Sequence, residues 1–589
     1  MQKTIQKHWF QWNAHQRKTA KILLNTLKKW ATTDLKHGLK ELSCKNTKSA
    51  NGNGEILTDT IGHWVKSKMV AGPYRHKPFK NFRINPLMAV VQKSKVRPIL
   101  NLSSPKDSSF NDAVNEFCIK KLEMSSAKLF SQTIFTAGKN SIMTKSDICD
   151  AYKIIPGHPS QWKCFGFKWL GRYFYDITTV FGSKSAPANF DCLPETLVNI
   201  VCSEEKIPRK WVHRQLDDVP VVSPKNTDYS ARFSDKYAVL CKKLNIPLAE
   251  FCPQKEKAFG PSTEGTILGI EFNTASMTWK IPKEKYNNSI KIIDLFLNSK
   301  TCNLKMIQQL HGKLTDFVQM CDFMLGFRFH LVKLLGNFEN NESETRIISE
   351  NLKKDLWTWK KCLKSSLDGF PICKPPMNSP VNAICFISDA AGASLQWEGK
   401  ICKNLSIPND RGVASIGYNK EKIFFSGGIR WPFHLITKAR DSKNRLFGGK
   451  STTLECIGLL IPFLCCPKIV KNKFVLLFVD NTNVIYAWEK KYCKNDQETS
   501  ILIRTLHILE AYLECKIFVQ HTKRLSNEMA SLVDHLSRQS STTAIDLKKI
   551  EKITWSQPEG TLVSWLKKPV ADWTIPNKIL EDVKNKMYP

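Results

Sequence analysis

Hydrophobic residues change their spacing along the chain, and the change separates segments of different architecture. Between residues 61 and 273, short apolar runs alternate with amphipathic segments, which is typical of an α+β unit. At its end, residues 265–281 (GTILGIEFNTASMTWKI) predict a strand, an Asn-Thr-Ala-Ser turn and a second strand. The first half of the chain is therefore expected to combine sheets and helices.

Helical spacing replaces this pattern after residue 300. Residues 304–321 and 352–363 each predict an amphipathic helix with one apolar packing face. The apolar positions of the two helices are Ile307, Leu310, Leu314, Phe317 and Cys321, then Leu352, Leu356, Trp359 and Leu363. Prolines in residues 370–380 then mark the clearest domain boundary. Strand-like runs return beyond it, at residues 383–387, 422–425 and 474–479.

Length and charge narrow the class of protein. At roughly 150 residues per domain, 589 residues form about four compact units. A net charge of +35 accompanies a hydrophobic fraction of 42%, so the chain is basic yet apolar enough to fold. Such an excess favours a polyanionic partner, because neutralised phosphates release counterions. Nucleic acid is the first candidate partner, and an anionic membrane surface is the second.

Basic residues are dense at the N-terminus. Residues 1–50 carry eleven Lys or Arg against two acids, with Trp9, Phe10, Trp12 and Trp30 between them. This composition predicts either a basic arm followed by a linker or a solvated helix packed on the body.

Other features indicate where the protein acts. The N-terminal residues lack the apolar stretch of a signal peptide, and the longest apolar run, residues 457–466, is too short to span a bilayer. The nineteen cysteines are never spaced CxxC, which predicts reduced thiols and no zinc site. We therefore expect a soluble intracellular protein, in the cytoplasm, the nucleus or both, with no membrane partner.

One group of acidic residues lies at predicted strand ends in the first half. Residues 145–155 (KSDICDAYKII) predict a strand that carries Asp147 and then a helix start. Residues 212–222 (VHRQLDDVPVV) predict two apolar strands bent around Asp217 and Asp218, the only adjacent aspartates in the chain. Neighbouring carboxylates repel each other unless a divalent cation lies between them, although aspartates also favour plain turns. The sequence around Asp217 and Asp218 is thus compatible with two interpretations, a metal site and a simple turn.

Further segments around these acids carry a family resemblance. In chain order they are KVRPILNLSSP (95–105), the strand with Asp147 and Tyr152, VFGSKSAPANF (180–190), the Asp217 and Asp218 pair, and LGI (268–270). The set resembles the motifs of reverse transcriptases and covers residues 60–335. The resemblance implies an α+β right-hand polymerase of fingers, palm and thumb, whose palm holds two metal ions.

The resemblance also implies roles for individual side chains. Asp147 and Asp217 would bridge two Mg²⁺ ions, with Mn²⁺ as a substitute, and Asp218 would be a supporting carboxylate. The implied nucleotide-binding residues are Arg97 and Lys95 for the triphosphate, Phe181 and Gly182 for the nucleotide pocket, Tyr152 beneath the sugar, and Lys257, with Lys255 as a rival, for the leaving pyrophosphate. An aromatic ring at position 152 would leave no room for a ribose 2′-hydroxyl, whereas a plain packing role is the alternative for Tyr152.

A second group of acids follows the proline-rich boundary. Asp389 ends the run ICFISD, Glu455 lies in STTLECIGLL, Asp480 ends FVLLFVD, and Asp534 lies in LVDHLSR. Two strand-end aspartates, a helical glutamate and a fourth acid resemble RNase H, which hydrolyses the RNA of an RNA:DNA hybrid with two metal ions. The interval between Asp389 and Glu455 is longer than in a minimal RNase H, which predicts an insertion or a long hairpin.

Longer stretches narrow the resemblance. Residues 85–112, 166–190, 534–539 and 564–573 resemble the polymerase of DIRS-like retrotransposons of the PAT group, which use a tyrosine recombinase rather than an integrase. Such an element implies a tyrosine recombinase and a Gag-like protein as partners. The implied segments are 1–60 (basic N-terminal arm and linker), 61–273 (fingers and palm), 274–335 (thumb), 336–380 (connection and proline-rich linker), 381–545 (α/β RNase H domain) and 546–589 (C-terminal tail).

Together these features predict an RNA- and DNA-templated DNA polymerase with RNase H activity, which copies retrotransposon RNA into DNA. Its substrates would be an RNA template, a DNA primer, deoxynucleoside triphosphates and an RNA:DNA hybrid, with two Mg²⁺ ions at each active site. A catalytically silent nucleic-acid-binding scaffold retained by the host is the alternative. An RNA-templated RNA polymerase is a weaker one, because Tyr152 and the RNase H motifs argue against it.

Overall fold

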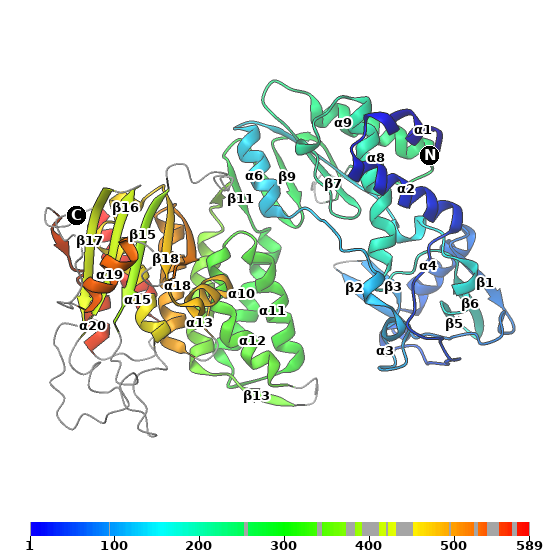
Figure 1. Ribbon diagram of the computed structural model, residues 1–589. Coiled ribbons are helices and arrows are strands. Elements are labelled where there is room, and N and C mark those ends of the chain that lie inside the picture. Colours follow the sequence, from blue (N-terminus) through cyan, green and yellow to red (C-terminus); the bar gives the residue numbers. More distant parts are fainter. Residues whose placement is uncertain are drawn as a thin grey trace. The chain divides into compact units, whose positions relative to one another are not determined.

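Helices and strands alternate through a chain that forms two compact units. The computed structural model describes residues 2–92, 95–251, 257–338, 344–372, 383–391, 412–419, 422–431, 451–493, 496–523, 528–538, 553–567 and 574–587. The first unit is Met1–Pro282 with Gly369–Pro375, and the second is Lys283–Asp368 with Pro376–Pro589. This mixture of helices and strands confirms the α+β class (Figure 1).

The first unit has four sheets in its described residues, with strand orders β7-β4-β8, β1-β6-β5, β2-β3 and β14-β11-β10-β9. Its strands are β1 (Val70–Tyr74), β2 (Leu87–Gln92), β3 (Lys95–Leu100), β4 (Ile142–Asp147), β5 (Gly166–Trp169), β6 (Arg172–Asp176), β7 (Asp218–Ser223), β8 (Phe259–Ser262), β9 (Glu264–Ile267), β10 (Ile270–Asn273), β11 (Thr278–Lys280) and β14 (Phe370–Pro371). Its helices are α1 (Gln2–His8), η1 (Trp9–Gln11), α2 (Ala14–Lys29), α3 (Lys48–Asn51), α4 (Gly54–Lys66), α5 (Phe110–Ala113), η2 (Glu116–Cys118), α6 (Ala127–Ala137), η3 (Ala151–Ile154), α7 (Pro159–Trp162), α8 (Ala186–Glu204), η4 (Arg209–Trp211) and α9 (Tyr229–Lys243).

Strand β4 is the structural centre of the first unit. It pairs antiparallel with β7 on one edge and with β8 on the other. Helix α9 packs on β4 and β7, and α8 packs on α9, which buries Phe190, Val219 and Phe233 in one cluster. Because hydrogen bonds hold β4 on both edges, the position of Asp147 at its end is fixed by the sheet.

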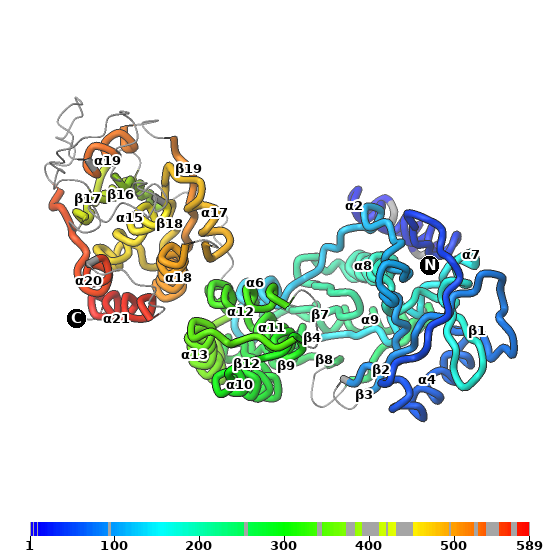
Figure 2. Tube along the Cα trace, turned by 90° about the horizontal axis from the view of Figure 1, so that it is seen from below, coloured from blue at the N-terminus to red at the C-terminus, as the bar shows by residue number. Residues whose placement is uncertain are grey.

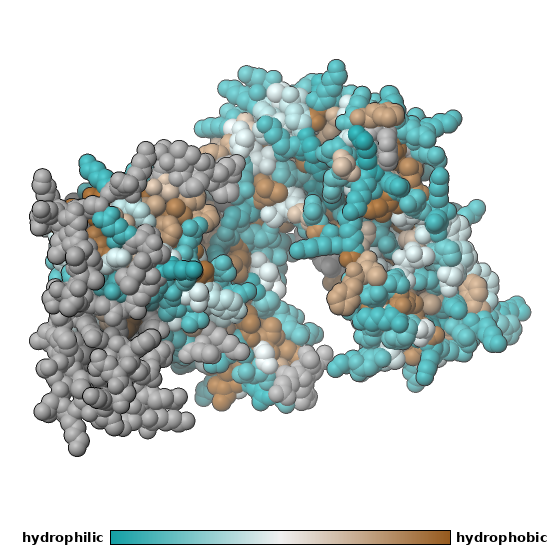
Figure 3. All heavy atoms as spheres, viewed as in Figure 1, coloured by the Kyte–Doolittle hydropathy of each residue, from teal (hydrophilic) through white to brown (hydrophobic). Residues whose placement is uncertain are grey.

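The N-terminal segment belongs to the same hydrophobic cluster. Ile5, Trp12 and Leu23 are buried with the apolar residues of α8, and α2 lies against α8 (Figures 1 and 2). Trp12 Nε1 donates a hydrogen bond to Ser203 Oγ at 2.8 Å. Of the two interpretations of residues 1–50, the structure therefore has the helix packed on the body. The face of the first unit seen in Figure 3 is mostly hydrophilic, in keeping with a chain so rich in lysine.

The second unit begins with a helical bundle and continues into a sheet domain (Figure 2). The bundle comprises α10 (Lys283–Asn298), β12 (Thr301–Asn303), α11 (Leu304–Val318), η5 (Asp322–Arg328), α12 (Phe329–Gly336), β13 (Thr345–Ile347) and α13 (Glu350–Ser365). The sheet domain comprises β15 (Ile384–Ala390), β16 (Gly412–Asn419), β17 (Lys422–Arg430), α15 (Ser451–Cys465), α16 (Pro467–Val470), β18 (Phe474–Val479), α17 (Thr482–Lys490), α18 (Gln497–Tyr512), β19 (Lys516–His521), α19 (Glu528–Arg538), β20 (Trp555–Ser556), α20 (Thr561–Lys567) and α21 (Ile575–Met587).

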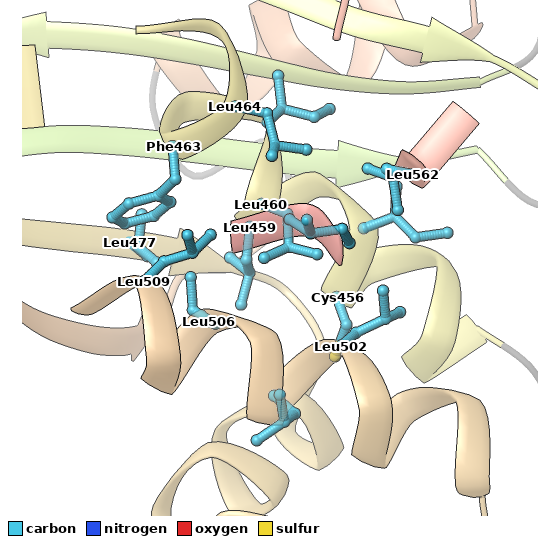
Figure 4. Packing of buried hydrophobic residues seen from close by; sticks show 14 of the residues in the cluster. Cys456, Leu459, Leu460, Phe463, Leu464, Leu477, Leu502, Leu506, Leu509 and Leu562 are labelled. Atoms are coloured by element: carbon cyan, nitrogen blue, oxygen red, sulfur yellow. The ribbon is translucent and has the colours of Figure 1, made fainter. Parts of the chain in front are cut away.

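The six-stranded sheet of the second unit has the order β19-β18-β15-β16-β17-β20. Strands β15, β16 and β17 form an antiparallel meander, and β18 and β19 extend it in parallel on the other side of β15. Neighbouring side chains point to opposite faces: Phe386 joins the cluster under α15 and α18, and Ile387 joins the cluster under α19. Figure 4 shows leucines of α15 and α18 packed against each other in the larger cluster.

Most of the predicted elements are present. The apolar positions named for residues 304–321 and 352–363 are buried and belong mainly to α11 and α13, and the predicted strands beyond residue 380 overlap β15, β17 and β18. Residues 265–281 form three strands instead of two, because Leu268 and Gly269, both at positive φ, make an additional tight turn between β9 and β10.

The proline-rich boundary is only partly a linker. Phe370 and Pro371 form β14, which pairs with β11 in the first unit. The first part of the first unit extends to Pro282. The six predicted segments stay a prediction. None of the described helices has the length and apolar character needed to cross a membrane.

A buried ion pair joins the bundle of the second unit to its sheet domain. Arg504 on α18 donates to Asp355 Oδ1 on α13 at 2.9 Å, and both side chains are fully buried. His330 Nδ1 lies 2.8 Å from the other carboxylate oxygen, and the guanidinium lies 4.7 Å from the ring centroid of Phe327. Because neither charge reaches water, each depends on its partner.

Removing one charge of this pair should destabilise the second unit. Asp355→Leu is expected to lower its free energy of unfolding by about 3–5 kcal/mol, because Arg504 is left as an unpaired buried cation. The double variant Asp355→Leu/Arg504→Met should lose less than the single variant. Urea denaturation measures both values, with Asp368→Asn at an exposed position as the control. Equal losses in the single and double variants would contradict the role of the pair.

Candidate functional site

The first candidate site lies where β4 and β7 meet. Asp147, the last residue of β4, is the antiparallel partner of Asp218, the first residue of β7. Just before β7, Gln215 N donates to Asp218 O at 2.8 Å, which closes a tight turn with Leu216 and Asp217 at its tip. The turn and the strand pair thus bring the three predicted aspartates to one end of the sheet.

Packing of Leu216 holds this turn in place. Leu216 has φ of +53°, a left-handed conformation that is unfavourable for a branched apolar residue, and it packs against the cluster around α8. Ile148 N also donates to Asp217 O at 3.1 Å. Apolar burial therefore offsets the strain and keeps Asp217 beside the end of β4.

Burial and repulsion act on the carboxyl groups at this end of the sheet. Burial raises the pKa of Asp217, and the negative charge of Asp147 raises it further. Burial also raises the pKa of Asp218 to about 6, although Lys145 opposes the rise. Carboxylates that are costly to keep ionised gain stability from a nearby cation.

Two lysines supply positive charge to the site. Lys145 Nζ lies 3.2 Å from Asp218 Oδ1, and Lys257 Nζ lies 3.3 Å from Asp147 Oδ2. Lys145 is buried, and sequence reasoning missed it, although its position two residues before Asp147 on one strand puts both on the same face. Lys257 was predicted for the pyrophosphate side; it contacts Asp147, and its predicted role stays a prediction. Lys255, its rival, lies outside the described residues.

Tyr152 lies beside these acids between two aromatic rings. Its ring centroid is 5.4 Å from that of Phe181 and 5.7 Å from that of Phe190. Burial raises the pKa of Tyr152, and the charge of Asp217 adds to the rise. Phe181 is 41% exposed, so the pair forms an apolar wall that solvent reaches on one side.

Gly182 joins this wall to the β2–β3 hairpin. Its φ is +112°, and a Cβ there would lie 2.5 Å from Leu100 O. The close approach of the Leu100 carbonyl therefore requires glycine at this position, and the predicted place of Gly182 in the nucleotide pocket stays a prediction. Arg97 is exposed on β3 and makes no ion pair among the described residues. Lys95 opens β3 opposite Gln92, and its side chain lies outside the described part of the chain.

The second candidate site brings three predicted acids together. Asp389 lies on β15, Glu455 on α15 and Asp480 directly after β18, and each offers an oxygen within 4.8 Å of the other two. Strands β15 and β18 are parallel neighbours, with Ile387 opposite Phe478, so the register continues to Asp389 and Asp480 at one sheet edge. Within the described ranges no other group of metal-binding side chains meets this closeness.

A serine connects Asp389 to the fourth predicted acid. Ser537 Oγ on α19 lies 2.5 Å from Asp389 Oδ2 and 2.9 Å from the carbonyl oxygen of Asp534. Asp534 does not join the three acids that meet within 4.8 Å, and its role stays a prediction. Sequence reasoning missed Ser537, although its spacing of three from Asp534 on a helix places both on one face.

Both groups of acids have the donors that a hard divalent cation binds. Carboxylate oxygens are the ligands that Mg²⁺ prefers, and Asp389 and Glu455 are nearly inaccessible to water, with 5% exposure each. Placing buried negative charges side by side is unfavourable without positive charge among them. At the first site Lys145 and Lys257 supply some of that charge. The residues at both sites therefore fit bound divalent ions.

Comparisons with known proteins find structural likeness only. No family model matches the chain, and no curated protein does. Among solved structures, a foamy viral protease–reverse transcriptase (dRH) in complex with double-stranded DNA has a TM-score of 0.41 at 14% identity, over 88% of this chain and 80% of that one. The foamy viral protease–reverse transcriptase in complex with an RNA/DNA hybrid has a TM-score of 0.43 at 12% identity, over 91% and 63%. Scores this low do not establish a shared fold, so the functional assignment depends on motifs and geometry.

Neutralising Asp217 should stabilise the fold when no metal is present. Its raised pKa means that the folded chain binds this proton more tightly than the unfolded chain, so the wild-type chain loses stability as pH rises above 3.8. The melting temperature of Asp217→Asn should therefore exceed that of the wild type at pH 7 in EDTA, and the gap should close towards pH 4.

Addition of Mg²⁺ provides the matching test. At one hundred times its dissociation constant an ion stabilises the folded state by about 2.7 kcal/mol, so Mg²⁺ should raise the melting temperature of the wild type more than that of Asp217→Asn. Asp150→Asn, an exposed acid nearby, serves as the control. Identical Mg²⁺ shifts in wild type and Asp217→Asn would argue against Asp217 as a ligand.

Proposed function

We propose that this chain is an RNA- and DNA-templated DNA polymerase with RNase H activity. The observation that carries the proposal is that the chain has two clusters of acidic side chains, one in each unit, and that each cluster lies at the ends of strands. Asp147, Asp217 and Asp218 gather at the β4–β7 edge, and Asp389 and Asp480 meet Glu455 at the β15–β18 edge. Two such sites match the two-metal chemistry of nucleotide transfer and of hybrid cleavage.

The first group suits nucleotide transfer. Divalent ions held by Asp147 and Asp217 would activate the primer 3′-hydroxyl and neutralise the leaving pyrophosphate. Arg97, exposed and without an ion pair among the described residues, offers a planar fork for phosphate oxygens. Lys257 would release Asp147 to the metal and turn its ammonium towards the phosphates. Tyr152 and Phe181 would form the wall against which the nucleotide sugar and base pack.

The second group suits hydrolysis of the RNA in a hybrid. The sheet supports an RNase H-like domain: its first three strands are antiparallel and the next two extend it in parallel beside the first. Asp389, Glu455 and Asp480 would hold the metal ions, and Ser537 orients Asp389. Asp534, one helical turn from Ser537, would be the fourth acid. Mg²⁺ is the proposed metal at both sites, with Mn²⁺ as a substitute.

The finer assignment rests on sequence motifs. We place the chain with DIRS-like retrotransposons of the PAT group, and expect it to act in the cytoplasm or nucleus with a tyrosine recombinase and a Gag-like protein. A silent nucleic-acid-binding scaffold is the second candidate. The close approach of Asp389, Glu455 and Asp480 favours the enzyme, because buried acids kept together without catalysis would only destabilise the fold.

Single substitutions should separate the two activities. Asp217→Asn is expected to reduce DNA synthesis by roughly 100-fold or more and to leave hybrid cleavage intact, since it removes a ligand from one site only. Asp480→Asn should do the reverse. Primer extension and cleavage of a labelled hybrid measure the two rates, with exposed Asp150→Asn and Glu489→Gln as controls. Loss of both activities in either variant, with folding intact, would contradict two independent sites.

Tyr152 should exclude ribonucleotides through its ring. Replacement by Val is expected to raise the ratio of ribonucleotide to deoxynucleotide incorporation at least tenfold, which corresponds to about 1.4 kcal/mol of lost steric discrimination. Tyr152→Phe retains the ring and should retain the wild-type ratio. Single-nucleotide extension gives kcat/KM for each substrate. If Val, Phe and Tyr give one ratio, Tyr152 only packs against Phe190.

A further inference from the structure

Helix α15 packs against strands β15 and β16 of the second unit with very little space at one glycine. A Cβ on Gly458 would lie 2.8 Å from Val413 Cγ2 on β16 and 2.9 Å from Ser388 Cβ on β15. Carbon atoms that are not bonded to each other do not come this close, so a larger residue would push the helix away from the sheet or displace its neighbours. Glycine at this position therefore permits the close approach of the helix backbone to both strands.

The carbonyl group of the same glycine links the helix to the sheet. In a regular helix this carbonyl would accept a hydrogen bond from the backbone N–H four residues later, but that residue is Pro462, which has none. Ser388 Oγ instead donates to Gly458 O at 3.2 Å, and it lies 3.1 Å from Ser415 Oγ. Ser388 and Ser415 are opposite each other on β15 and β16, and both are buried. The sheet therefore supplies a donor that the helix itself lacks.

Both contacts lie next to acids of the second candidate site. Ser388 directly precedes Asp389 on β15, and Gly458 follows Glu455 by three residues on α15, within one helical turn. Asp389 and Glu455 offer oxygens within 4.8 Å of each other. The separation of these two carboxylates depends on how closely the helix approaches the strand, and Gly458 and Ser388 lie at that approach.

We propose that Gly458 and Ser388 are positioning residues, which hold Glu455 close enough to Asp389 for both to bind one small divalent ion. Mg²⁺ requires near-octahedral ligands at about 2.0–2.1 Å, whereas Ca²⁺ accepts longer and more variable distances of about 2.3–2.6 Å. A helix held close to the strand therefore favours Mg²⁺ over Ca²⁺. The proposal rests on the proposed function only in taking these acids as metal ligands.

Titration with metal alone tests this positioning without hybrid cleavage. Binding of Mg²⁺ and of Ca²⁺ is measured by isothermal titration calorimetry in the full chain carrying Asp217→Asn, and addition of Asp389→Asn identifies the signal of the second site. Gly458→Ala should weaken Mg²⁺ binding by about 10-fold or more, because changes to groups that orient metal ligands typically cost about 10–100-fold in affinity. Ca²⁺ binding should fall by about 3-fold or less, since Ca²⁺ tolerates a wider separation of its ligands.

A second pair of variants separates positioning from stability alone. Ser388→Ala removes the donor to the Gly458 carbonyl, and addition of Pro462→Ala gives that carbonyl an N–H inside the helix. The double variant should therefore regain melting temperature. Because it still lacks the hydrogen bond between helix and strand, it should keep the weakened Mg²⁺ binding of Ser388→Ala. Recovery of both the melting temperature and Mg²⁺ binding in the double variant would show that Ser388 is only structural, and would overturn the proposal.

Gly312 provides the matched control for the glycine. It lies on α11, and a Cβ there would meet no atom within 4 Å outside its own part of the helix, so Gly312→Ala should bind both ions as the parent chain does. The proposal is overturned if Gly458→Ala does the same, or if it loses Mg²⁺ and Ca²⁺ affinity equally. Hybrid cleavage by the unsubstituted chain reports on the proposed function alone, so absent cleavage with intact Mg²⁺ preference would contradict that function and leave the positioning supported.

Discussion

Repulsion between carboxylates at the ends of buried strands is the constraint on which both candidate sites depend. Ionised acids are unstable in a place that water barely reaches, as the raised pKa of Asp217 and of Asp218 reflects. The chain tolerates them because β4, β15 and β18 are each paired with a strand on both sides, which limits how far the acids can move apart. A bound metal ion would then relieve a repulsion between carboxylates that is already present in the folded chain.

The scaffold supplies this rigidity in two different ways. In the first unit β4 is central, and a strained turn at Leu216 is held by apolar packing beside α8. In the second unit parallel strands align their carboxyl ends, and α19 brings Ser537 to Asp389. The buried pair of Arg504 and Asp355 then ties this sheet domain to the helical bundle. Each of these contacts holds other parts of the chain in position, and none is proposed to contact a substrate.

Patterns of local sequence were enough to find the acids but not their surroundings. Asp389 and Asp480 end apolar runs, so the strand pattern alone indicated them, whereas Asp147 follows the polar residues Lys145 and Ser146 and was indicated by the order of motifs around it. The same alternation could have indicated Lys145. Nothing local indicates the partner of Arg504, because Asp355 lies 149 residues away and the pair exists only after packing.

Turns and termini were harder to predict for the same reason. Leu216 has a positive φ, where glycine is usual, and its packing against the cluster that contains α8 explains this conformation. Residues 1–50 read equally well as an arm or a packed helix, since burial of Ile5 and Leu23 depends on apolar surface far along the chain. Tertiary packing therefore determines both the conformation of Leu216 and the docking of the N-terminal helix.

Metal-dependent DNA synthesis tests the central claim most directly. The wild-type chain is incubated with a homopolymer RNA template, a complementary DNA primer and the matching deoxynucleotide, with Mg²⁺ or with EDTA. Extension with Mg²⁺ and none with EDTA is the expected result. A folded chain that binds the primer-template yet never extends it, with Mg²⁺ or Mn²⁺, would contradict the polymerase and favour a silent scaffold.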